Sequence, residues 1–131
     1  MWPKSFWYKI YEPFIRKAAG LGVASTKHDK ERYEHKYEYC DLLIAGSGPS
    51  GLASAYSAAK NGAKVILAED KPRYGGSLLT SDVNIGNQSG KDWADGIISE
   101  LKEMPNVTVK NRSQVFGYYD HNMMVMSVSY T

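Results

Sequence analysis

The most constraining feature of this sequence is a glycine-rich turn between an apolar run and an alanine-rich segment. Residues 41–45 have the composition of a short buried strand, and Gly46-Ser47-Gly48-Pro49-Ser50-Gly51 ends that strand abruptly. Residues 52–60 follow without a helix breaker, and residues 63–68 form a second apolar run. A crossover of this length between two apolar strands is almost always right-handed, so the pattern predicts a βαβ unit with parallel strands.

The glycines of this turn have the spacing of a phosphate-binding loop. Gly46 permits a tight turn out of the strand, Gly48 lets the backbone approach a pyrophosphate, and Gly51 lets the helix pack against the strand. Pro49 suits the first helical turn, where its missing N–H forfeits no intrahelical bond. Because no side chain obstructs the helix N-terminus, its free N–H groups can donate to a diphosphate. The turn therefore predicts a dinucleotide site.

An acidic residue follows the second apolar run at the position where such sites bind a ribose. Glu69 lies 18 positions past Gly51, close to the offset of about 20 at which a carboxylate accepts hydrogen bonds from the ribose hydroxyls. Asp70 is the alternative acceptor if the strand runs one residue longer. Both carboxylates would repel a 2′-phosphate, which favours NAD or FAD over NADP, although Lys71 and Arg73 keep NADP as a minor alternative.

A second glycine-rich segment follows the acid. Arg73-Tyr74-Gly75-Gly76 resembles the extended fingerprint of flavoproteins with two dinucleotide-binding domains, and its glycines would let a second loop approach the cofactor. An ordinary loop is the alternative, because paired glycines are common in turns. The expected cofactor-binding residues are Gly46, Ser47, Gly48, Pro49, Ser50, Gly51, Glu69, Asp70, Arg73, Gly75, Gly76 and Ser77.

The remaining periodicities predict an α/β fold. We expect a Rossmann-like βαβ unit of the FAD/NAD(P)-binding type with a parallel sheet, followed by a helix and a β-hairpin. The expected segments are loops over 71–90 with at most a short helix near 77–79, a helix over 91–104, a strand over 106–110, and a hairpin of 115–119 with 123–130.

The first 39 residues differ in composition from the rest. An aromatic and basic arm over 1–22, with a short helix expected over 14–19, precedes a charged linker over 23–39. Charges spread through the arm do not fit a secretory signal peptide, and a weak resemblance to a transit peptide remains as an alternative. We therefore expect residues 1–39 to be a docking arm and linker, and residues 40–131 to be the first half of an FAD/NAD(P)-binding domain.

Charge and cysteine content exclude several function classes. A net charge of +2 without a basic patch gives no reason to expect nucleic acid or a membrane as a partner. The single cysteine, Cys40, excludes an intrachain disulfide and fits a reducing, cytoplasmic compartment. His28 and His35 lack metal-ligand spacing, and His121 has the neighbours of a turn residue. We expect no metal site and no catalytic residue in this chain.

Several segments outside the glycine turn resemble the α subunits of the bacterial heterotetrameric sarcosine oxidases. The similarity includes the arm over 11–22, the linker over 32–35, the loop over 71–79, and the hairpin Val115-Phe116-Gly117-Tyr118-Tyr119-Asp120-His121-Asn122. Generic flavoproteins share the glycine turn but neither that arm nor that hairpin. The resemblance covers nearly the whole chain.

The resemblance implies a specific activity and a division of labour. These enzymes demethylate sarcosine oxidatively to glycine and hydrogen peroxide and pass the one-carbon unit to tetrahydrofolate. The β subunit carries FAD, FMN lies where α and β meet, and α binds NAD, with smaller subunits completing the assembly. The family's α subunit is several times longer, so the resemblance implies an incomplete, truncated domain that is inactive alone. Positions carried over to NAD binding are Gly46, Gly48, Gly51 and Glu69, with Gly75 and Gly76 lining the site.

Two alternatives remain open on the sequence. One is an NAD- or FAD-binding module of another flavin-dependent amine or opine oxidoreductase. The other is a non-catalytic assembly module whose aromatic arm docks on a partner chain.

Overall fold

The computed structural model describes residues 19–20, 26–27 and 34–129. The chain divides between Lys36 and Tyr37 into two units, and every helix and strand in the described residues lies in the second unit. Apart from Ala19, the helix expected over 14–19 lies outside the described residues, as does most of the aromatic arm.

A three-stranded parallel sheet organises the second unit. Its strands are β1 (Leu42–Ala45), β2 (Val65–Ala68) and β5 (Val107–Lys110), with β2 in the middle. All four residues of β2 are buried, whereas both ends of β1 are exposed. A central strand that is covered on both faces is uniformly apolar. The central position of β2 therefore explains why its sequence is apolar without interruption. The predicted βαβ unit is confirmed.

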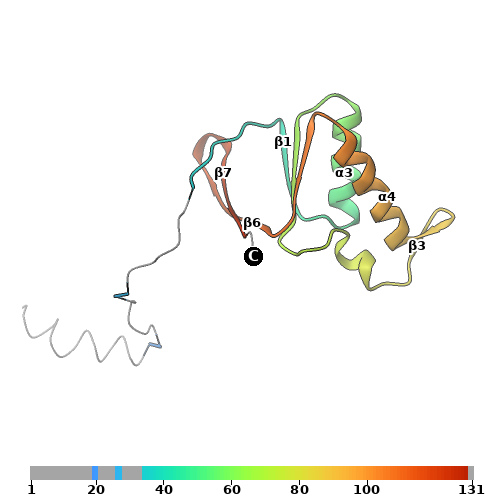
Figure 1. Ribbon diagram of the computed structural model, residues 1–131, viewed down its shortest axis with the longest axis horizontal. Coiled ribbons are helices and arrows are strands. Elements are labelled where there is room, and N and C mark those ends of the chain that lie inside the picture. The colour runs from blue at the N-terminus through green and yellow to red at the C-terminus, as the bar shows by residue number, and fades with distance from the viewer. Residues whose placement is uncertain (1–18, 21–25, 28–33, 130–131) are drawn as a thin grey trace, which may run out of the picture. The chain divides into compact units, whose positions relative to one another are not determined.

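Two helices cover one face of this sheet. Figure 1 shows α3 (Pro49–Lys60) and α4 (Gly90–Glu103) side by side next to the strands, with the hairpin of β6 and β7 on the opposite side of the sheet. Leu52 of α3 and Leu101 of α4 are fully buried against Leu67 of β2. No helix in the described part of the chain is long and apolar enough to cross a membrane.

Both helices begin and end at residues that explain their bounds. Pro49 is the first residue of α3, and at its far end the Asn61 amide Nδ2 donates to the Ser57 carbonyl at 2.8 Å. Helix α4 begins one residue before the predicted 91–104, because the Ser89 side chain accepts the Asp92 N–H at 3.2 Å and caps it. It ends ahead of Pro105, which cannot continue a helix.

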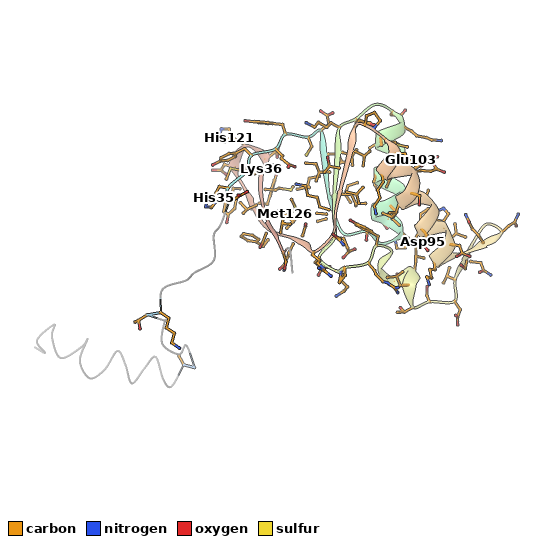
Figure 2. All side chains as sticks on the ribbon, viewed as in Figure 1. His35, Lys36, Asp95, Glu103, His121 and Met126 are labelled. Carbon is orange, nitrogen blue, oxygen red and sulfur yellow. The ribbon has the colours of Figure 1, made fainter. Side chains whose placement is uncertain are left out.

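The predicted hairpin is confirmed with shifted ends. Strand β6 (Ser113–Tyr119) pairs antiparallel with β7 (Met123–Val128), with a bulge between Val115 and Gly117. The turn η3 (Asp120–Asn122) holds His121 in the left-handed region with φ of 62°. Figure 2 shows His121 at this turn and Met126 on the strand that follows. The backbone conformation explains why turn-forming residues occupy this position.

The segment between β2 and α4 contains a short pair of strands that the sequence did not predict. The short helix expected near 77–79 is present as η2 (Gly76–Leu79). Strands β3 (Asn84–Ile85) and β4 (Gln88–Ser89) pair around Gly86, whose φ is +63°. Two-residue strands have too little sequence for an alternating pattern to emerge, so loops were expected there.

Candidate functional site

The glycine turn lies at the carboxyl edge of the sheet, where loops from all three strands meet. The segments that follow β1, β2 and β5 leave the sheet together at its lower edge in Figure 1. Ligands of open α/β sheets bind outside this edge. The Gly46 N–H donates to the Ala68 carbonyl at 2.7 Å, which extends the β1–β2 pairing into the turn itself.

The three glycines of the turn meet different surroundings. Gly46 has a φ of +108°, a conformation that side chains rarely adopt. A Cβ on Gly51 would lie 2.1 Å from the Gly46 carbonyl oxygen, so α3 packs directly on the turn. A Cβ on Gly48 would meet nothing within 4 Å. The space in front of the helix is therefore open at Gly48 and closed at Gly51.

The N-terminus of α3 has the features of an anion site. Gly48 is the N-cap residue and offers no side chain to cap the helix, and Pro49 has no N–H to donate. The N–H groups of Ser50 and Gly51 have no intrahelical acceptor at this end of the helix. A phosphate placed before Gly48 would meet these donors and the positive end of the helix dipole.

The Glu69 carboxylate is buried against the glycine turn. Glu69 follows β2 directly and is only 5% exposed. Its Oε2 accepts the Ser47 backbone N–H at 3.0 Å and also the Ser47 hydroxyl, and its Oε1 accepts the Lys71 N–H at 3.1 Å. Asp70 is exposed. Of the two acids that the sequence left open, Glu69 is the one that is hydrogen-bonded to the glycine turn.

The hydrogen bonds keep this buried acid ionised. Burial by itself raises the pKa of Glu69, but hydrogen bonding to the side chains of Asp70 and Ser47 and to the backbone N–H groups of Lys71 and Ser47 outweighs it. The pKa of Glu69 therefore lies below its ordinary value. A fixed negative charge here accepts hydrogen bonds from sugar hydroxyls and repels an additional phosphate.

The second glycine pair packs directly on the first turn. The Gly75 N–H donates to the Ser47 hydroxyl oxygen at 3.1 Å. A Cβ on Gly76 would lie 3.1 Å from the Gly48 Cα, and Gly76 has a φ of +54°. Loops separated by 28 positions in the sequence are thus in contact.

The structure brings together only part of the residue set expected for the cofactor. Around the turn, Ser47 contacts Glu69 and Gly75, and Gly76 lies against Gly48. The other polar members are exposed to solvent; they are Ser50, Asp70, Arg73 and Ser77. Their part in binding stays a prediction.

The sequence did not single out Tyr74, which extends the site toward α4. Burial, and after it the charge of Glu69, raises the pKa of the Tyr74 phenol. The Lys102 ammonium lies 5.3 Å from the centre of the Tyr74 ring. A cavity of about 550 Å³ opens between these residues, and Arg73, Lys91 and Asp95 also line it. Figure 2 shows Asp95 on α4.

The remaining candidate groups in the described part of the chain are the Cys40 thiol and the side chains that could bind a metal ion. Burial, and then the Asp41 charge, raises the pKa of the half-buried Cys40 thiol, which makes it a poor nucleophile. The described residues bring together no group of three or more His, Cys, Asp or Glu that could hold a metal ion.

Comparisons with known proteins agree with the resemblance found in the sequence. Residues 41–124 match the family model described as FAD dependent oxidoreductase. Sarcosine oxidase subunit alpha of Rhizobium meliloti (strain 1021) is 47% identical over 123 residues, which is 94% of this chain and 12% of that protein. The subunit of the same name from Corynebacterium sp. (strain U-96) is 36% identical over 82% of this chain and 11% of its own length.

The chain therefore spans about an eighth of the length of the curated relatives that it matches. Among solved structures, L-proline dehydrogenase from P. horikoshii superimposes with a TM-score of 0.60 over 73% of this chain and 21% of that chain, at 19% identity. That likeness supports the fold.

Replacing Gly51 by alanine tests the packing of α3 on the turn. The added Cβ would contact the Gly46 carbonyl at 2.1 Å, so we expect Gly51→Ala to lower the free energy of unfolding by about 1–3 kcal/mol in urea titration. Gly96→Ala is the control, because a Cβ there meets nothing within 4 Å in the middle of α4, and it should raise stability by up to about 1 kcal/mol. Equal stability of Gly51→Ala and the unmodified chain would contradict the observed packing.

The lowered pKa of Glu69 predicts a loss of stability in acid. A group whose pKa is lower in the folded state contributes stability above its unfolded pKa of about 4.3, and this contribution disappears as the pH falls through the folded pKa. The free energy of unfolding should therefore decline below about pH 4.3 more steeply in the unmodified chain than in Glu69→Gln. Parallel curves for the two proteins between pH 5 and pH 2 would show that Glu69 is not held as described.

Proposed function

Because this chain belongs to the FAD dependent oxidoreductase family, we propose that its glycine turn and Glu69 bind the diphosphate and the adenosine ribose of NAD. The observation that carries the proposal is the open approach at Gly48 beside the buried, hydrogen-bonded carboxylate of Glu69. The α3 N-terminus supplies donors for the diphosphate, and Glu69 supplies an acceptor for a ribose hydroxyl.

The residues around Glu69 favour an unphosphorylated ribose. The pKa of Glu69 lies below its ordinary value, so the carboxylate is charged at neutral pH. A 2′-phosphate next to it would be repelled, and the nearby Arg73 is exposed to solvent instead of paired with the turn. NAD is therefore preferred to NADP. FAD shares the adenosine diphosphate portion of NAD, so the same contacts would hold either, and the choice of NAD follows the resemblance to the sarcosine oxidase α subunits.

The described residues bind and orient the cofactor in this proposal and carry no bond-making step. A nicotinamide dinucleotide, when bound, supplies a group that exchanges a hydride. Ser47 and Lys71 orient the Glu69 carboxylate, while Gly48 leaves room for the diphosphate.

At the level of the whole protein, we propose a subunit of a sarcosine oxidase. Its assembly would oxidise sarcosine to glycine with oxygen as the electron acceptor, which is reduced to hydrogen peroxide, and would transfer the one-carbon unit to tetrahydrofolate. FAD and FMN would be held with the help of other subunits. The proposal rests on the 47% identity to a sarcosine oxidase subunit alpha. The single cysteine agrees with a cytoplasmic location.

The exposed face of the hairpin supports assembly with further protein. Phe116 is 61% exposed and Tyr118 67% exposed, and both lie on β6. Large aromatic side chains that gather on one element usually face a partner. The docking role proposed for residues 1–39 would add to the same assembly.

Alanine at Gly48 should separate binding from folding. A Cβ there meets nothing within 4 Å of protein, but it would occupy the path of the diphosphate. We expect Gly48→Ala to keep its stability within about 0.5 kcal/mol and to weaken NAD binding at least tenfold in calorimetry. Glu69→Ala should also weaken NAD binding, by about tenfold, through the lost acceptor.

Gly96→Ala is the matched control for this experiment, because it adds the same methyl group on α4, away from the turn. The unmodified chain and Gly96→Ala should bind NAD equally and NADP more weakly. NAD binding that Gly48→Ala leaves unchanged would refute a diphosphate at this turn.

A further inference from the structure

Ser47 lies in the middle of the glycine turn and has contacts that the glycine pattern does not require. The three glycines account for the turn, the phosphate approach and the helix packing. Ser47 is fully buried, and its hydroxyl forms hydrogen bonds with Glu69 and with Gly75, which lie 22 and 28 positions further along the chain. An alanine would fill the same space without these hydrogen bonds.

The hydrogen bonds of Ser47 give the two carboxylate oxygens of Glu69 different donors. Each carboxylate oxygen offers two acceptor positions. Oε2 receives both the N–H and the hydroxyl of Ser47, so its two positions are filled. Oε1 accepts the Lys71 N–H and receives no hydrogen bond from Ser47. Ser47 therefore occupies Oε2 and leaves Oε1 as the oxygen to which a ligand hydroxyl can donate.

The same hydroxyl also holds the second loop. It accepts the N–H of Gly75, which is buried, at 3.1 Å. The adjacent Gly76 then lies against the Gly48 Cα, because a Cβ at Gly76 would approach that atom to 3.1 Å. A single side chain thus connects the acid after β2, the glycine turn and the Gly75–Gly76 loop. No side-chain polar atom buried in the described residues is left without a hydrogen-bond partner.

We propose that Ser47 is a positioning residue that reserves Oε1 of Glu69 for one ribose hydroxyl and fixes the Gly75–Gly76 loop against the turn. This inference rests on the proposed NAD site for the identity of the ligand. The part that concerns the free protein does not depend on that identity. Loop position and ribose binding are coupled, since the hydroxyl that orients the acid also holds the loop.

The test combines two measurements on the free 131-residue chain with one on its complex with NAD. Ser47→Ala should speed hydrogen exchange at the Gly75 amide about tenfold, because the buried acceptor is lost. It should raise the pKa of Glu69 in a carboxyl NMR titration. It should weaken NAD binding about tenfold and move the acidic midpoint of binding to higher pH, which a purely structural role of Ser47 would not do.

Ser113→Ala is the matched control. Ser113 is also a buried serine, but its hydroxyl donates to the Asn111 carbonyl at 2.8 Å and not to Glu69. In Ser113→Ala, the exchange rate of the Gly75 amide, the pKa of Glu69 and the acidic midpoint of NAD binding should equal those of the unmodified chain.

Each outcome bears on the inference separately from the proposed function. In the unmodified chain without nucleotide, the Gly75 amide must be protected from exchange, and rapid exchange there overturns the inference even if Ser47→Ala does not fold. An unchanged Glu69 pKa in a folded Ser47→Ala protein overturns it as well. If the Gly75 and Glu69 results appear as expected but the unmodified chain binds no NAD, the positioning role stands for the free protein and the proposed function fails.

Discussion

The contact between Ser47 and Glu69 joins the ends of β1 and β2, and the candidate site depends on it. A buried carboxylate is costly unless donors surround it, and here the turn after β1 supplies two of them. The fold and the chemistry of the site thus share one interaction. The turn is held in place by the acid, and the acid is kept charged by the turn.

The missing side chain has opposite roles at two glycines near this contact. At Gly51 the missing side chain lets α3 pack on the carbonyl of Gly46, so it contributes to stability. At Gly48 the missing side chain leaves open space that the free protein does not use. An anionic ligand needs such open space to approach a helix N-terminus. The Gly75–Gly76 loop closes the other side of the turn, and through Tyr74 it reaches Lys102 on α4.

Local patterns made most of the fold predictable. The apolar runs at 41–45 and 63–68 and the turn residues near His121 act within a few positions, and each marked an element whose observed ends differ by one or two residues. The short pairing of β3 with β4 was missed because two residues carry no periodicity.

Side-chain contacts across the chain could not be predicted in the same way. Nothing near Ser47 indicates that its hydroxyl meets Glu69 and Gly75, because those partners come close only once the sheet has formed. The approach of Lys102 to Tyr74 depends likewise on how α4 packs. The choice between NAD and FAD lies beyond the glycine pattern, since both share the diphosphate and ribose that the pattern would bind.

Amide NMR of the ¹⁵N-labelled chain during titration with NAD tests the central claim most directly. The account predicts saturable shifts that are largest at Gly48, Ser50, Gly51 and Lys71, since these amides surround the proposed diphosphate and ribose positions. Shifts confined to the β6–β7 hairpin, or none at millimolar NAD, would contradict it.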